Sequence, residues 1–132
     1  MNLVGEPSCF ERNLAALREG DPELARRLEG VPPLGERLIQ TASGSFTLKA
    51  SGEDGADLFL HSRNDPAAEA ESLLAKVPKE GVTAYIVYGL GAGHHLTRLL
   101  ADTPAASKGV VFERSLAHLR AAFELQDWTE AL

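Results

Sequence analysis

A glycine-rich stretch between an apolar run and an amphipathic run constrains the fold of this chain most. Residues 84–88 (AYIVY) are typical of a β-strand, three alternating glycines follow, and leucines recur from Leu96 at helical spacing. Glycine adopts backbone conformations that other residues resist, and a helix beginning after such a turn offers free N–H groups and partial positive charge to an anion. The sequence therefore predicts a strand, a turn and a helix, with Gly89, Gly91 and Gly93 as a candidate binding turn for phosphate or carboxylate.

A second strand and a last helix follow this unit. Residues 109–112 (GVVF) predict a strand that ends at Glu113, and Ser115 can cap a helix after it. The order strand, helix, strand, helix predicts a parallel crossover, and so an α/β fold with a Rossmann-like βαβα unit. Rossmann folds often hold ribose hydroxyls with an acidic residue at the end of the second strand, which makes Glu113 a candidate ligand residue.

The preceding half of the chain changes its periodicity once. Helix-compatible spacing predicts two short helices over residues 8–18 and 22–29, which form a helical cover within residues 1–33. Over residues 34–62 the spacing of apolar residues changes towards every second position. This pattern predicts three short antiparallel strands that flank the edge of the parallel sheet.

Residues 63–132 begin with the clearest helix start in the chain. Asp65 can cap a helix with Pro66 in its first position, and the helix is predicted to carry an apolar stripe at Ala70, Leu73, Leu74 and Val77. Together the segments predict a single domain over residues 1–132. Because a Rossmann-like sheet normally continues through more strands, we expect this domain to be the N-terminal fragment of a longer protein.

Composition and charge exclude several classes of function. The net charge of −6 argues against a nucleic-acid surface, because phosphate backbones are bound by clustered Lys and Arg. No apolar run is long enough to span a membrane, and the N-terminus lacks the pattern of a signal peptide, so we expect a cytoplasmic protein. A single cysteine, Cys9, excludes an internal disulfide, and no Cys/His spacing predicts a metal site.

The glycine turn departs from the two commonest cofactor signatures. His94 stands where the dinucleotide fingerprint has its third glycine, and Val87 stands where S-adenosylmethionine-dependent methyltransferases usually carry an acidic residue. At most one of the adjacent His94 and His95 can face the turn. Arg63 is the polar residue near the predicted strand end that is left without a structural role. A nucleotide site and a purely structural turn both remain open.

Three stretches resemble a known family. Residues 60–74 (LHSRNDPAAEAESLL), 86–100 (IVYGLGAGHHLTRLL) and 110–128 (VVFERSLAHLRAAFELQDW) resemble the N-terminal region of motility-associated factor (Maf-type) flagellin glycosyltransferases. The resemblance implies a longer protein that transfers nonulosonic acid sugars to Ser or Thr of flagellin. Its transferase centre is expected in a following domain. This chain would then be a binding or assembly domain without catalytic residues, and its partners would be the missing C-terminal domains and flagellin.

The resemblance also implies roles for single residues. The first motif is matched by His61, Ser62, Asp65 and Pro66, the second by the three glycines and His95, and the third by Glu113. Asn64 and His94 replace two tyrosines of the family pattern. The glycines would supply N–H groups to a nucleotide or nucleotide-sugar, Glu113 would hold hydroxyls, and His95 or Arg63 would meet negative charge. The rival hypotheses are an S-adenosylmethionine-dependent methyltransferase-like domain and a non-catalytic interaction module.

Overall fold

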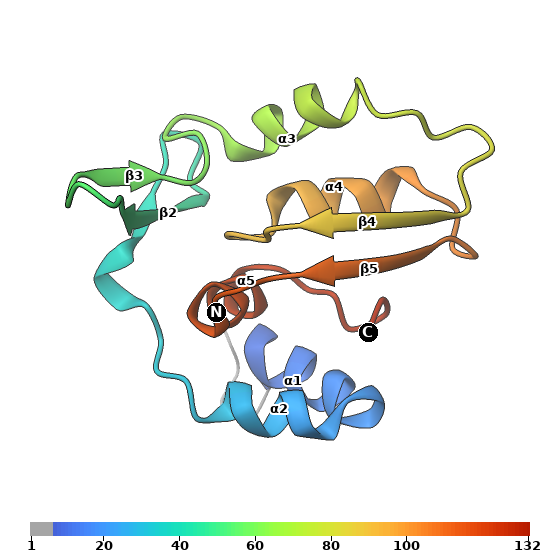
Figure 1. Ribbon diagram of the computed structural model, residues 1–132, viewed down its shortest axis with the longest axis horizontal. Coiled ribbons are helices and arrows are strands. Elements are labelled where there is room, and N and C mark those ends of the chain that lie inside the picture. The colour runs from blue at the N-terminus through green and yellow to red at the C-terminus, as the bar shows by residue number, and fades with distance from the viewer. Residues whose placement is uncertain (1–6) are drawn as a thin grey trace.

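Five helices, one short 3₁₀ helix and five strands make up residues 7–132, which are the residues that this computed structural model describes. In chain order they are α1 (Cys9–Gly20), α2 (Pro22–Glu29), η1 (Gly35–Arg37), β1 (Leu38–Gln40), β2 (Phe46–Ser51), β3 (Asp57–Phe59), α3 (Pro66–Leu74), β4 (Ala84–Tyr88), α4 (His94–Asp102), β5 (Lys108–Phe112) and α5 (Leu116–Leu125). Figure 1 shows α3, the strand pair β4–β5, α5 and the helix pair α1–α2 following one another from top to bottom. The mixed α/β class predicted from the sequence is confirmed.

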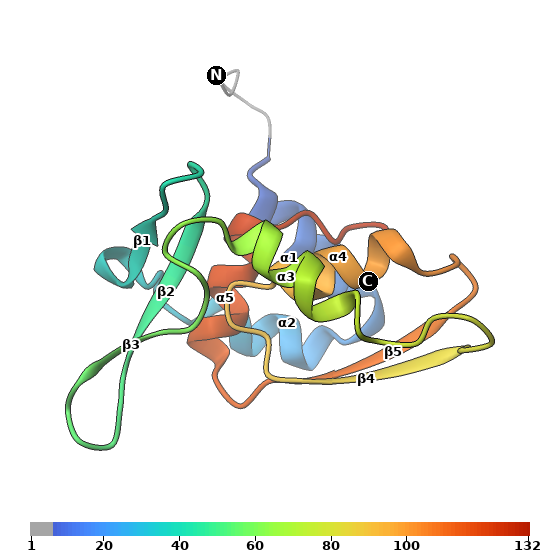
Figure 2. The same cartoon turned by 90° about the horizontal axis from the view of Figure 1, so that it is seen from above.

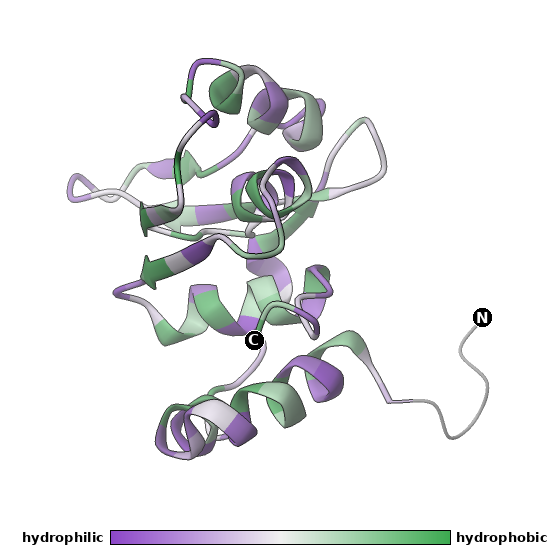
Figure 3. Ribbon diagram, turned by 90° about the vertical axis from the view of Figure 1, so that its right-hand side faces the viewer, coloured by the Kyte–Doolittle hydropathy of each residue, from purple (hydrophilic) through white to green (hydrophobic). Residues whose placement is uncertain are grey.

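Both predicted N-terminal helices are present, as α1 and α2. Ser8 and Glu11 make a reciprocal capping box at the start of α1, and the Asp21 side chain caps α2 by accepting from the Leu24 N–H. Helix α1 packs against both α2 and α5. In Figure 3 apolar and polar segments alternate along α1 and α2, as expected for amphipathic helices. Residues 1–6, the start of the predicted 1–33 cover, lie outside the described residues.

The antiparallel strands were predicted to flank the parallel sheet, and this is wrong. Strands β1, β2 and β3 form a separate three-stranded sheet, while β4 pairs with β5 alone. The reason lies in the residues after β3: Ser62 and Asp65 turn the chain directly into α3, and α3 packs on α4. In Figure 1 the β2–β3 hairpin therefore lies beyond the end of β4 and not along its edge.

Helix α3 starts where the sequence predicted, at the Asp65 cap and Pro66, but its stripe is shorter than predicted. The helix ends at Leu74, so Val77 lies outside it. Ala70 is buried, whereas Leu73 is exposed, because α4 is the one helix that packs closely on α3. A helix with a single neighbour buries a narrow stripe, and the rest of its apolar surface stays in water.

The parallel unit matches the prediction in order and direction. Strands β4 and β5 pair in parallel from Ala84 opposite Lys108 to Tyr88 opposite Phe112. The main core lies between α1, α2 and α5 and is closed by the residues that follow α5. Its buried members are Leu14, Ala25, Leu28, Leu90, Ala122, Phe123 and Trp128. Among the described helices, none combines the length and hydrophobicity needed to span a bilayer.

Candidate functional site

The glycine turn joins the end of β4 to the start of α4. Gly89, Gly91 and Gly93 all have positive φ, which side chains other than glycine rarely tolerate. Two of them also lack room for a side chain. A Cβ on Gly91 would lie 2.5 Å from the Nε2 atom of His61, and a Cβ on Gly93 would lie 2.5 Å from the ring of Trp128. The turn is therefore closely packed against the protein itself.

The N–H groups of this turn have acceptors within the chain. The Leu90 and Gly91 amides donate to Oε2 of Glu113 at 2.6 and 3.3 Å. The Ala92 amide donates to Nε2 of His61 at 2.8 Å, and the Gly93 amide donates to the Leu90 carbonyl at 2.9 Å. A carboxylate and an imidazole from this chain thus occupy the positions where a Rossmann turn would hold a phosphate.

Glu113 connects the turn to the next helix. Its second carboxylate oxygen accepts from the Ser115 amide at 2.9 Å, so one side chain joins the end of β5 to the glycine turn. Burial acts to raise the pKa of Glu113, but the amides of Ser115, Leu90 and Gly91, together with His118, outweigh it and hold the pKa below its ordinary value. The carboxylate is therefore ionised at neutral pH and stabilises the turn as an anion.

His61 reaches the same turn from the chain that follows β3. Because Nε2 accepts from the Ala92 amide, the ring proton of neutral His61 is on Nδ1. Burial, together with the neighbouring charges of His94, His95 and His118, lowers the pKa of His61 to about 4. His61 is thus a neutral acceptor at physiological pH, and protonation would remove its bond to the turn.

The two adjacent histidines of α4 point to different partners. His94 is buried, and its Nε2 lies 2.7 Å from the Phe46 carbonyl on β2. His95 is half-buried, and its Nε2 lies 2.9 Å from the carbonyl of Gly89. The rings of His94 and His95 lie 5.1 and 6.1 Å from that of His61. The structure therefore gathers three histidines around the turn, with His95 facing its first glycine.

Arg63 does not join this group in any described contact. Its guanidinium lies 4.5 Å from the centre of the Phe59 ring, which is a cation–π contact at the surface. Among residues 7–132, no cluster of three or more His, Cys, Asp or Glu side chains is arranged to hold a metal ion. The structure thus brings together the three glycines, His95 and Glu113, and leaves Arg63 apart.

Sequence reasoning missed the residues that hold Trp128 beneath the turn. The Trp128 indole N–H donates to Thr97 Oγ1 at 2.8 Å, and its backbone N–H donates to Asn13 Oδ1 at 2.9 Å. The Asn13 amide donates in turn to the carbonyls of Phe123 and Gln126 at 3.0 and 2.6 Å. The sequence did hold one indication of these contacts, because Asn13 stands among the apolar positions of α1. A side-chain amide that is buried needs polar partners.

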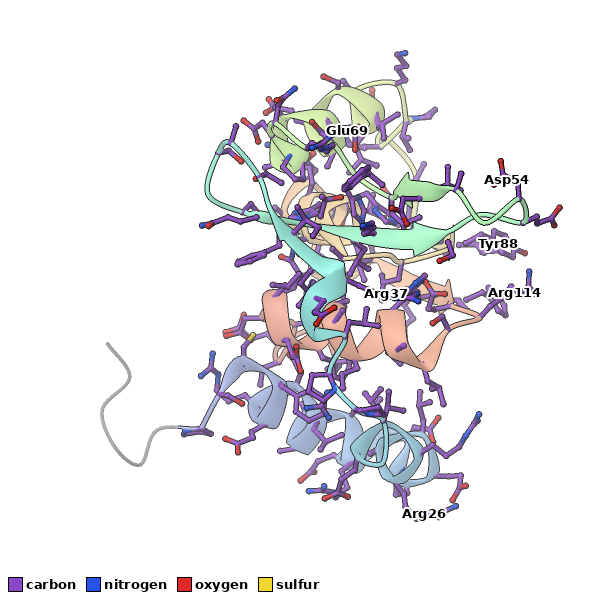
Figure 4. All side chains as sticks on the ribbon, turned by 90° about the vertical axis from the view of Figure 1, so that its left-hand side faces the viewer. Arg26, Arg37, Asp54, Glu69, Tyr88 and Arg114 are labelled. Atoms are coloured by element: carbon purple, nitrogen blue, oxygen red, sulfur yellow. The ribbon has the colours of Figure 1, made fainter. Side chains whose placement is uncertain are left out.

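The strand pair that carries the turn leaves one face open. Parallel strands are usually covered on both faces, but here Ile86 is 64%, Tyr88 78%, Val110 52% and Phe112 51% exposed. The rings of Tyr88 and Phe112 stack 5.2 Å apart. Figure 2 shows β4 and β5 along one border of the molecule, with the helices on the other side, and Figure 4 shows Tyr88 projecting outwards. We call these four residues the open face.

Comparison with known proteins gives a fold relationship. No family model matches the sequence, and no curated protein matches it. The solved structure of a Maf glycosyltransferase from Magnetospirillum magneticum AMB-1 is similar, with a TM-score of 0.72 and 18% sequence identity. The similarity covers 93% of this chain and 24% of that protein, so the chain spans about a quarter of its length. The chain therefore has the fold of a segment of a Maf glycosyltransferase.

Proposed function

We propose that this chain is the N-terminal, Rossmann-like region of a motility-associated glycosyltransferase-like protein, and that it serves assembly of that protein. The full-length protein would transfer a nonulosonic acid sugar to flagellin, with its catalytic centre in the chain that follows. The support is the similarity in fold over 93% of the chain and the three motifs around His61, Gly89 and Glu113. In this proposal the chain contributes no catalytic residue.

The open face carries the assembly role. Ile86, Tyr88, Val110 and Phe112 place contiguous apolar surface on a sheet whose strands, within the described residues, pair only with each other. Such surface is unfavourable in water and marks contact sites. We assign its partner as the following domain of the same protein, because 24% coverage leaves most of the similar Maf protein outside the matched region.

The glycine turn has a structural role in this proposal. Its amides already donate to Glu113 and His61, so a bound nucleotide would have to displace an internal carboxylate and an imidazole. A cost of this kind opposes binding, because each displaced group leaves a hydrogen bond unmade. His95 holds the Gly89 carbonyl, and Arg63 covers Phe59 at the surface.

Thiol labelling tests the docking of the open face. Val110→Cys is introduced with Cys9→Ser, and labelling is compared between residues 1–132 and a longer product of the same gene. We expect at least tenfold slower labelling in the longer protein. The matched control is Ala56→Cys, an exposed position in the β2–β3 loop, which should be labelled at the same rate in both. Equal rates at Val110→Cys, or a stop codon directly after Leu132, would contradict the proposal.

Calorimetric titration tests the structural role of the turn. The chain is titrated with S-adenosylhomocysteine, with CMP and with a CMP-activated nonulosonic acid, and we expect no binding by any of them. Tight binding of S-adenosylhomocysteine would favour a methyltransferase-like domain. If CMP or the CMP-sugar binds, and if the Glu113→Gln substitution abolishes this binding, the turn is a ligand site.

A further inference from the structure

A second feature at the carboxyl ends of the strands is an apolar cavity of about 290 Å³ beneath the glycine turn. Its walls come from α1, α2, α4, β5 and α5, from the loops that follow β4 and β5, and from the segment after α5. The main apolar contributors are Leu17, Leu24, Leu96, Val111, Phe123 and Trp128. In open α/β sheets, ligands bind outside the carboxyl ends of the strands, which is where this cavity lies. Its volume lies just below the range of drug-sized ligand sites, which suits a smaller molecule.

The cavity is separate from the open face. Side chains alternate between the two sides of a strand, so Val111 points to the opposite side of β5 from Val110 and Phe112. A domain that docks on the open face therefore does not cover Val111 or fill the cavity that Val111 lines. The inference below does not depend on the proposed assembly role.

Two arginines give the rim of the cavity a positive charge. Arg27 on α2 and Arg114 after β5 both line it and are exposed, and within residues 7–132 neither has an ion-pair partner. The N-terminus of α5, at Leu116, adds the partial positive charge of a helix end. The carboxylate of Glu113 also lines the cavity, but three backbone amides already donate to it. The rim is thus suited to an anion.

We propose that this cavity binds a small anionic amphiphile, with its apolar body against the leucines, Phe123 and Trp128 and its anionic group at Arg27 and Arg114. Apolar walls exclude water and favour a hydrocarbon or aromatic body. The two guanidinium groups select a carboxylate, phosphate or sulfonate head, because they bind such groups through paired hydrogen bonds. A nucleotide does not fit this description, since its polar sugar would lie against leucine side chains.

The chain contains its own reporter for this site. Trp128 is the only tryptophan in the sequence, it lines the cavity, and its indole N–H is held by Thr97. The test titrates the chain with octanoate, 1-octanol and octylamine, and follows tryptophan fluorescence and the single indole N–H resonance. We expect all three apolar chains to perturb Trp128, with octanoate binding tightest and octylamine weakest.

Charge variants separate this site from general hydrophobic binding. Arg27→Gln and Arg114→Gln should each weaken octanoate binding about two- to fivefold and leave octanol binding unchanged, as expected for one partly exposed charge contact. The matched control is Arg26→Gln, because Arg26 is the neighbouring residue, pairs with Glu23 and does not line the cavity. Absence of any response of Trp128 to octanoate would overturn the proposal. Equal affinity for octanoate and octanol, or an equal effect of Arg26→Gln, would overturn it as well.

Discussion

The substitution Gly93→Ala tests how tightly the turn is packed, and Gly89→Ala is its matched control. Both residues have positive φ, of 85° and 82°. A Cβ at position 89 has no neighbour within 4 Å, whereas one at position 93 lies 2.5 Å from two ring carbons of Trp128. Trp128 is buried and donates hydrogen bonds to Asn13 and Thr97, so it cannot move aside without losing them.

The expected magnitudes follow from these two terms. Left-handed backbone strain alone costs about 1–2 kcal/mol for an alanine, and this is the whole effect expected for Gly89→Ala. Overpacking adds about 1–3 kcal/mol, so Gly93→Ala should lower the free energy of unfolding by roughly 2–5 kcal/mol. Urea unfolding followed by far-ultraviolet circular dichroism measures both values. A Gly93→Ala protein as stable as the Gly89→Ala protein would refute the packing argument.

Two further substitutions test the groups that fill the turn. Lowering the pH from 7 to 4.5 should lower the free energy of unfolding by about 1–2 kcal/mol through His61. The reason is that the ring takes up a proton below pH 6.5 in the unfolded chain, whereas its pKa in the folded chain is about 4. The expected loss is reduced because His61 is partly exposed and solvent screens its charge. His61→Gln keeps an acceptor for Ala92 and should lose less over this range; an unchanged pH dependence of urea unfolding contradicts this. Glu113→Gln should cost about 1–3 kcal/mol in the same assay at pH 7, because an amide cannot accept all three N–H groups. The control is Glu130→Gln, at an exposed carboxylate, which should change the free energy of unfolding by less than about 0.5 kcal/mol. If Glu113→Gln and Glu130→Gln have equal effects, Glu113 does not stabilise the turn.

Local chemistry made much of this fold predictable. The starts of α2, α3 and α5 were predicted from Asp21, Asp65 and Ser115, because each caps its helix through a hydrogen bond to a residue three positions later. The strands on either side of α4 were predictable for a similar reason, since β-branched and aromatic residues favour extended backbone.

Long-range pairing could not be predicted in the same way. The antiparallel strands have the composition of sheet edges, but composition does not say which sheet they join, and Ser62 and Asp65 direct the chain away from β4. The candidate site shows the same limit. Glu113 was predicted as a ligand residue from its place at a strand end, whereas its acceptance of the Leu90 and Gly91 amides depends on a side-chain direction that spacing does not encode.

The hydrogen bonds of Asn13 have a consequence for synthesis of the chain. Three of its partners, Phe123, Gln126 and Trp128, are synthesised more than a hundred residues after it. On a ribosome, α1 and α2 therefore emerge before α5 and Trp128, and the apolar surface that they turn towards these residues stays uncovered until the segment with Trp128 has left the exit tunnel. Contacts of such high sequence separation are formed late and slowly. Exposed apolar surface of this kind favours aggregation and chaperone binding. A chain that is terminated before Trp128 would lack one of the buried residues of its main core.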